Sequence, residues 1–165
     1  MPTPCFGVKP MFLHIAKKRR CGYNFFMRIL GLDVGNKRIG VALSDPGGLI
    51  AQPCLVITRR GLDADVAEVL KAATLNDVEK IVVGLPYSLD GTLGPQGEKV
   101  LKFIEALKKA TSLDIETWDE RFSTAAVERT LIEGDVSRAD RKGVVDKVAA
   151  AFILQGYLDS KGPRE

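Results

Sequence analysis

Residues 28–43 read RILGLDVGNKRIGVAL, and this stretch decides the fold. Residues 28–35 are apolar around a single interior charge and predict a short buried strand. Asn36 and Lys37 supply a turn, after which residues 38–43 return as a second strand, so the stretch predicts a hairpin. The run Leu-Val-Ile-Thr at residues 55–58 adds a third strand, and together they predict a meander of three antiparallel strands.

Further along the chain, strands alternate with helices. Helical spacing of apolar residues begins at Leu62, with Asp63 and Asp65 suited to a helix start. The next predicted elements are an apolar strand at 80–85, a loop over 86–97, a helix around 100–107, a strand at 115–119, a helix capped by Ser123 or Thr124, and a helix over 144–158. We therefore expect an α/β fold whose mixed five-stranded sheet has three antiparallel and then two parallel strands, with helices on both faces.

Length and composition are those of one globular domain. The chain has 165 residues, of which 45% are hydrophobic and 27% charged. The first 26 residues differ from the rest, with five basic side chains and no acidic one. We expect residues 1–26 to be a dispensable or mis-started extension, residues 27–160 to form the domain, and residues 161–165 to be a tail. The alternative is that residues 1–26 form a basic arm that contacts phosphate.

From Met27 onward the chain lacks the residues of several common active sites. This part holds 19 basic and 21 acidic residues, no histidine and one cysteine. That cysteine, Cys54, lies in an apolar run and is expected to be buried packing. A Ser-His-Asp triad, a Cys-His pair and a zinc site of the usual His/Cys type are therefore excluded for this part. Carboxylates are the side chains left for catalysis.

Asp33 is the first candidate, because it lies inside an apolar strand where an ionised carboxylate is costly unless it is paired or bound to metal. Gly35 follows two residues later and would allow a phosphate or metal to approach the backbone. An ordinary turn at the end of a strand is the alternative.

Asp119 and Glu120 come next, and strand alternation directs them to opposite faces. They could instead stabilise the start of the following helix, and Arg121 could form either a surface ion pair or a phosphate contact.

Asp146 is the third candidate, because it shares the apolar stripe of the last predicted helix with Ala150 and Ile153. The alternative is a carboxylate that only stabilises the helix N-terminus. Three carboxylates within ~4 Å would repel one another by about 4 kcal/mol per pair, which favours a metal site over a structural cluster. Ligation by oxygen alone suits Mg²⁺ or Mn²⁺, and a two-metal site would support phosphodiester hydrolysis.

Four blocks of sequence resemble the YqgF/RuvX family in order and spacing. They are residues 32–42 (LDVGNKRIGVA), residues 82–86 (VVGLP) with 90–92 (DGT), residues 119–124 (DERFST), and residues 142–150 (KGVVDKVAA). The resemblance implies the RNase H-like fold of the RuvC resolvases and a bacterial cytoplasmic location. It further implies a nuclease that acts in 5′-end maturation of pre-16S ribosomal RNA, in a family also described as Holliday junction resolvases.

Carried onto this chain, the resemblance implies that Asp33, Glu120 and Asp146 are the catalytic and metal-binding acids, with Glu120 preferred over Asp119. The residues expected to contact the substrate backbone are Gly35, Asn36, Lys37, Arg38, Arg121, Ser123, Thr124 and Lys142. One departure concerns the second acid of the resolvases, which follows the fourth strand. This chain has Gly84-Leu85-Pro86 there, so the site depends on whether Glu120 reaches it from the next strand.

Three other functions remain open. A Holliday junction resolvase would need a two-fold dimer to cut both strands symmetrically. A binding module could keep the fold without catalysis. The Asp-x-Gly hairpin also opens the nucleotide-binding domains of sugar kinases, actin and Hsp70 chaperones, but those folds use two such domains and this chain has room for one.

The expected partners are nucleic acid, with pre-rRNA before branched DNA, and ribosomal assembly factors. We expect a monomer or weak homodimer, and no membrane partner.

Overall fold

The computed structural model describes residues 28–87, 91–119 and 141–162, and in residues 141–146 it describes the course of the helix only. Five strands form one sheet: β1 Arg28–Val34, β2 Arg38–Ser44, β3 Ala51–Thr58, β4 Val78–Leu85 and β5 Asp114–Asp119. Their order across the sheet is β3-β2-β1-β4-β5. The β1–β2 and β2–β3 pairs are antiparallel, whereas β1–β4 and β4–β5 are parallel. The predicted mixed sheet is therefore confirmed.

β3 begins four residues earlier than the predicted strand at residues 55–58, and the added part includes Pro53. Proline has no backbone N–H and interrupts most strands, but it is tolerated where a strand lies at the edge of a sheet. β3 is such an edge strand. Pro53 pairs with Ala42 where the register of the β2–β3 pair shifts. The edge position thus accommodates a proline within the strand.

In the described part of the chain, three helices cover the sheet: α1 Leu62–Leu75, α2 Pro95–Ala110 and α4 Arg141–Lys161. α1 begins at the predicted residue, and α4 extends the predicted helix at both ends. The prediction that the loop continues to Gly97 is wrong, because α2 begins at Pro95. Proline suits the first turn of a helix, where its missing N–H would have no intrahelical partner. No helix in the described ranges has the length and hydrophobicity needed to cross a membrane.

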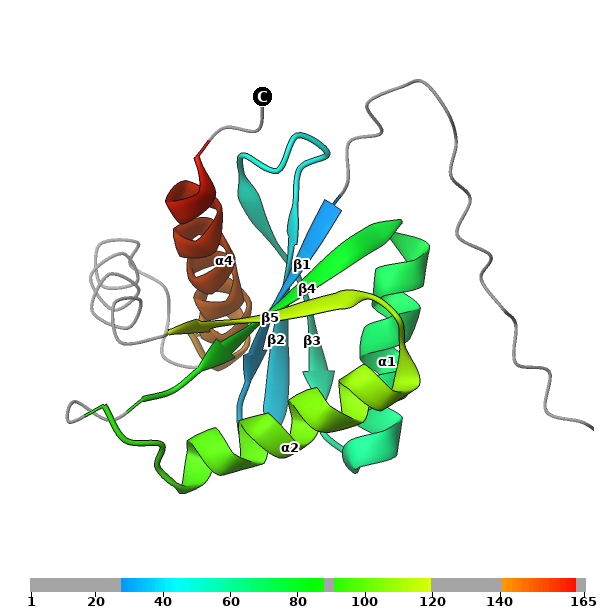
Figure 1. Cartoon of the computed structure of the whole chain (residues 1–165), viewed down its shortest axis with the longest axis vertical. Coiled ribbons are helices and arrows are strands. Elements are labelled where there is room, and N and C mark those ends of the chain that lie inside the picture. Colours follow the sequence, from blue (N-terminus) through cyan, green and yellow to red (C-terminus); the bar gives the residue numbers. More distant parts are fainter. Residues whose placement is uncertain (1–27, 88–90, 120–140, 163–165) are drawn as a thin grey trace, which may run out of the picture.

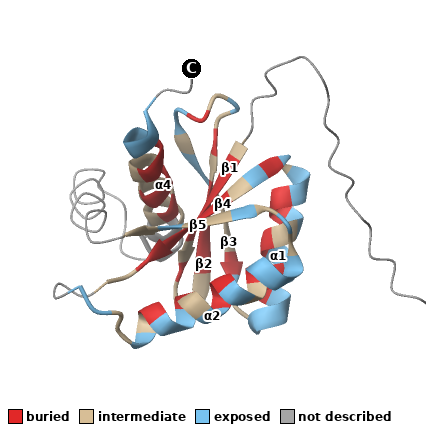
Figure 2. Ribbon diagram, viewed as in Figure 1, coloured by how far each residue is buried: buried red, intermediate tan, exposed pale blue. Residues whose placement is uncertain are grey.

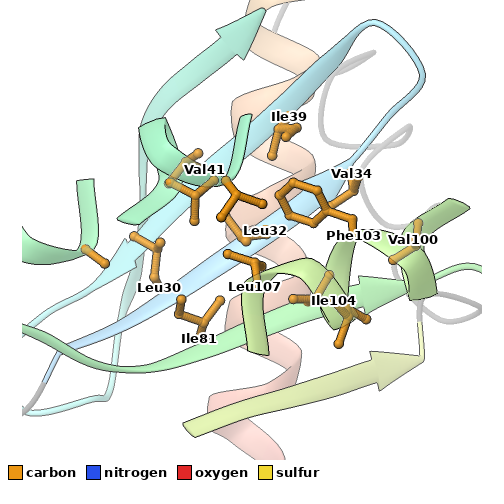
Figure 3. Packing of buried hydrophobic residues seen from close by; sticks show 14 of the residues in the cluster. Leu30, Leu32, Val34, Ile39, Val41, Ile81, Val100, Phe103, Ile104 and Leu107 are labelled. Carbon is orange, nitrogen blue, oxygen red and sulfur yellow. The ribbon is translucent and has the colours of Figure 1, made fainter. Parts of the chain in front are cut away.

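Helices lie on both faces of the sheet, with α1 and α2 on one side and α4 on the other (Figure 1). The larger core fills the space beneath α1 and α2, where Leu30, Leu32 and Val34 of β1 pack with Phe103 (Figure 3). Burying each side chain of this size contributes about 1.5–3 kcal/mol relative to leaving it exposed. The smaller core lies beneath α4 and includes Ile29. Burial follows the same arrangement, with the buried residues of each helix on the side that faces the sheet (Figure 2).

α4 lies close to β1 at Gly31. A Cβ atom at this position would lie 2.6 Å from the Leu154 Cβ and 3.2 Å from the Ala150 carbonyl oxygen, so only glycine allows the helix to lie this close. Gln155 on α4 accepts a hydrogen bond from the Ala51 N–H at the start of β3 (2.9 Å). α4 runs opposite to β1, so its first turns lie toward the end of β1 (Figure 1).

Candidate active site

Asp33 is the next-to-last residue of β1 and lies on the face of the sheet that α4 covers. Side chains alternate along a strand, and Leu32 and Val34 face the core beneath α1 and α2. Gly31, two residues before Asp33, faces α4. Asp33 is half-buried. Asp33 thus lies inside an apolar strand, as the sequence predicted, and close to the carboxyl end of that strand.

Glycines occupy the strand positions around Asp33 on this face. Gly31 and Gly35 lie two residues before and after it, and Gly40 is its partner on β2. Gly84 is the neighbouring position on β4, one step beyond the Leu32–Val83 pair. None of the four positions carries a side chain, so none of them places a side chain beside the carboxylate. α4 covers the backbone at Gly31.

The orientation of β5 distinguishes between Asp119 and Glu120, the two acids that the sequence left as alternatives. Trp118 faces α4, because its ring makes an edge-to-face contact with Tyr157 at 5.9 Å between centroids. Asp119 is the next residue and therefore points to the other face, consistent with its register partner Leu85, which belongs to the core beneath α1 and α2. Asp119 is thus on the wrong face to join Asp33. The position of Asp119 leaves Glu120 as the candidate; Glu120 lies outside the described residues, so its role stays a prediction.

The other predicted site residues are only partly described. Arg121, Ser123 and Thr124 lie outside the described residues. Asp146 and Lys142 lie within α4, and Asp146 is four residues, or about one turn, before Ala150, which lies over Gly31. The helix backbone thus carries Asp146 from Gly31 toward the end of β1 that holds Asp33. Among the side chains that the structure describes, no three His, Cys, Asp or Glu residues come together as a metal site.

The turn between β1 and β2 carries the other predicted substrate contacts. The Gly35 N–H donates to the Arg38 carbonyl oxygen at 2.9 Å and closes the turn. The side chains of Asn36 and Lys37 are exposed, and that of Arg38 is half-buried. The Lys99 ammonium on α2 donates to the Asn36 Oδ1 at 2.9 Å. The predicted contact residues therefore lie together beside Asp33, with a lysine that the sequence did not suggest.

Three further residues hold this turn, and sequence reasoning missed them. Arg59 donates from Nη1 to the Gly35 carbonyl oxygen (3.1 Å). Gln96 donates from Nε2 to the Val34 carbonyl oxygen (2.8 Å). Asp65, predicted only as a helix-start acid, is 1% exposed and accepts from the Arg59 Nε at 2.9 Å. No local pattern marks these residues, because the contacts join segments 24 and 62 residues apart.

The sequence model of the RuvX family, described as Holliday junction resolvase, matches residues 27–160. The chain belongs to the RuvX family. A relative from Desulforamulus reducens is 57% identical over 134 residues, covering 81% of this chain and 98% of that protein. A relative from Clostridium kluyveri is 55% identical over 133 residues, covering 81% and 97%. Both carry the name "Putative pre-16S rRNA nuclease".

Two solved structures share the fold of this RuvX member. One is Thermus thermophilus RuvC in complex with a Holliday junction substrate, with a TM-score of 0.54, 15% identity, and coverage of 84% of this chain and 98% of that one. The other is the fowlpox virus resolvase with Holliday junction DNA, with a TM-score of 0.53, 13% identity, and coverage of 82% and 99%. The expected RNase H-like fold is confirmed. Family membership and the names of the relatives support nuclease activity.

Proposed function

We propose that this RuvX member is a divalent-metal-dependent nuclease that hydrolyses phosphodiester bonds in 5′-end processing of pre-16S rRNA. One observation carries the proposal: Asp33 lies at the carboxyl end of a central strand, with glycine at every neighbouring strand position on its face. The relatives that cover nearly the same length are named for this reaction. Ribosomal RNA is processed in the bacterial cytoplasm, so we propose that location and, as partners, pre-rRNA and ribosomal assembly factors.

The residues present fit Mg²⁺ or Mn²⁺. Asp33 supplies carboxylate oxygens, and we propose that Asp146 from α4 and Glu120 after β5 supply the others. Hard cations of this kind prefer oxygen ligands and keep several waters, which suits a carboxylate flanked by Gly40 and Gly84. When bound, such ions stabilise charge on the phosphoryl oxygens and lower the pKa of water.

The β1–β2 turn would hold the substrate beside the acids. Lys37 is exposed at the tip of the turn. A cationic side chain there would contact phosphate oxygens without reading the base sequence. We propose the same role for Arg38, Arg121, Ser123, Thr124 and Lys142, and backbone contacts at Gly35 and Asn36. The chain would thus fix the scissile phosphate between this turn and the carboxylates.

The test is to incubate the protein with a labelled pre-16S rRNA 5′ leader and with a four-way DNA junction, each with Mg²⁺, Mn²⁺ or EDTA. We expect metal-dependent cutting of the RNA. Glu120→Gln should abolish cleavage, whereas Asp119→Asn, the matched control on the opposite face, should retain it. Cleavage of neither substrate by folded protein would contradict the proposal and favour a binding module.

Symmetric cutting of the junction is the second candidate activity, because the family description names resolvases. A resolvase that cuts two strands symmetrically needs a two-fold dimer. Preferential cleavage of the junction, together with a dimer in sedimentation analysis at the assay concentration, would replace RNA processing with this activity. A strictly monomeric protein that cuts only the RNA leader would exclude it.

A further inference from the structure

A buried ion pair lies next to the β1–β2 turn. Arg59 follows β3, and its Nε lies 2.9 Å from the Oδ2 of Asp65 on α1. The second oxygen, Oδ1, accepts from the Arg60 N–H at 2.9 Å. The Asp65 side chain is 1% exposed and that of Arg59 is 19% exposed. Both carboxylate oxygens are therefore engaged, as a buried charge requires.

The environment fixes the position of the Arg59 guanidinium. Burial raises the pKa of Asp65, but hydrogen bonds from the Arg60 N–H and the Arg59 side chain outweigh it, so the pKa lies below its ordinary value and the pair is ionised. The guanidinium also lies 5.9 Å from the centroid of the Phe103 ring, in the core beneath α1 and α2. Such a pair contributes little net stability compared with apolar packing. This makes a positioning role the better explanation of its burial.

The guanidinium holds the turn through its backbone. Nη1 donates to the Gly35 carbonyl oxygen at 3.1 Å, and the Arg59 main-chain N–H donates to the Lys37 carbonyl oxygen at 3.0 Å. Gln96 and Lys99 of α2 donate to the Val34 carbonyl oxygen and the Asn36 Oδ1. Each of the four residues 34–37 thus offers an acceptor to a donor from the α2 helix or the connection between β3 and α1.

This arrangement orients the peptide between Gly35 and Asn36. In a planar trans peptide the C=O of one residue and the N–H of the next point in opposite directions. The Gly35 carbonyl points to Arg59, which lies on the α1/α2 side with Phe103. The Asn36 N–H of the same peptide therefore points away from Arg59. Amide groups directed this way attract anions such as phosphate.

We propose that Arg59, held by Asp65, is a positioning residue that directs the Asn36 N–H to a phosphate oxygen of the substrate beside Asp33. The inference rests on the proposed nuclease function. The pair contacts no substrate itself. It acts by fixing the turn, so its loss should raise KM for RNA more than it lowers kcat, and should leave the affinity for Mn²⁺ nearly unchanged because Asp33 is untouched.

The test compares Arg59→Ala, Arg59→Lys and Asp65→Asn with wild type. Hydrogen–deuterium exchange should become faster at the amides of residues 35–37 in all three variants, because each loses the link from Asp65 through Arg59 to Gly35. Lysine keeps the charge but cannot contact Asp65 and Gly35 at the same time. We expect kcat/KM for the RNA leader to fall about 10- to 100-fold, the range for residues that orient a site without contacting substrate. Glu116→Gln is the matched control, since it breaks an ion pair elsewhere beneath α4 and should change neither measurement.

Three results would overturn the inference: unchanged exchange at the turn in Arg59→Ala, a loss of kcat/KM no larger than in Glu116→Gln, or full activity in Arg59→Lys. Failure of the nuclease proposal can be distinguished from these results. If wild type cuts no substrate, the proposed function fails, and exchange at the turn together with RNA affinity from filter binding still decides whether Arg59 positions a phosphate-binding amide. Unchanged RNA affinity in Arg59→Ala would then reject it.

Discussion

The face of the sheet beneath α4 carries two carboxylates in contrasting surroundings. At the carboxyl ends of the parallel strands, Asp33 is flanked by glycines at every neighbouring strand position. Glu116 lies two strands away on β5, level with Val82 of β4 and Gly31 of β1, and therefore about 7 Å back along the strand direction from Asp33. It is surrounded by side chains. It pairs with the Lys80 ammonium, accepts from the Tyr157 hydroxyl at 2.9 Å, and lies 3.5 Å from the Lys161 ammonium.

The electrostatics of the second group are those of a structural network. The hydrogen bond from Lys80 lowers the pKa of Glu116 and outweighs the effect of burial. Burial alone would lower the pKa of Lys80, but its hydrogen bonds to Glu116, Asp114 and Tyr157 raise it. The network joins α4 to β4 and β5. The contrast lies in the neighbouring strand positions: charged side chains contact the structural carboxylate, whereas glycines flank the one that we assign to catalysis.

Asp33→Asn is the substitution expected to have the largest effect. We expect cleavage to fall by about 10³-fold or more, which corresponds to about 4 kcal/mol of transition-state stabilisation. Stability without metal should be retained, since asparagine has the same shape. Addition of Mn²⁺ should raise the Tm of wild type, because the ion binds the folded state only, and should not raise that of the variant. Full activity in the variant would remove Asp33 from the site.

Gly31→Ala tests how closely α4 must lie to β1 for the site to form. The added Cβ would lie 2.6 Å from the Leu154 Cβ, so the helix must shift. Overpacking of this kind costs about 1–3 kcal/mol in the free energy of unfolding, measurable by urea denaturation. Because α4 also carries Asp146, cleavage should fall in protein that is still fully folded. Loss of stability with unchanged kcat would show that the site does not depend on this approach.

Glu116→Gln should lower stability and leave activity unchanged, whereas Asp33→Asn should lower activity and leave stability unchanged. Loss of its ion pairs with Lys80 and Lys161 should lower the free energy of unfolding by about 1–2 kcal/mol, because the group is partly exposed to solvent. The kcat for RNA should stay at the wild-type value in folded protein. Urea denaturation and a cleavage assay on the same preparation check both. A variant as stable as wild type but inactive would mean that the structural and catalytic roles of the two carboxylates have been assigned the wrong way round.

Much of the fold could be predicted because it depends on local pattern. The hairpin of residues 28–43 and the strand at residues 80–85 are evident from runs of apolar residues. One error came where tertiary position overrides local preference: Pro53 is accepted because β3 lies at the edge of the sheet, which cannot be recognised before the order of the strands is known. The other was a missed local signal, because proline favours the first turn of a helix and Pro95 begins α2.

The candidate site was predictable only in part. Asp33 is conspicuous in the sequence because it is a charge inside an apolar strand. The glycines beside it on β2 and β4 are separated from it along the chain, and only the register of the strands makes Gly40 and Gly84 its neighbours. Similarly, Arg59 and Asp65 are meaningful only once the turn at Gly35 lies against them.

The smallest predicted effect is in acid, and it sharpens the contrast between the two carboxylates. Because the pKa of Glu116 is lowered in the folded state, its ion pairs stabilise the protein above the unfolded-state pKa of about 4.3. This contribution is lost as the pH falls through the lower folded-state value. The destabilisation caused by Glu116→Gln at pH 7 should therefore shrink progressively below about pH 4.

Ser44→Ala provides a control without a titrating group for this pH dependence. The buried Ser44 hydroxyl accepts from the Ile29 N–H at 2.9 Å, so its removal should destabilise the protein equally at pH 7 and pH 3. Urea denaturation of wild type and both variants across this range separates the two effects. If the destabilisation by Glu116→Gln were as independent of pH as that by Ser44→Ala, the charge of Glu116 would contribute nothing to stability. The shape of the side chain alone would then explain its place beneath α4.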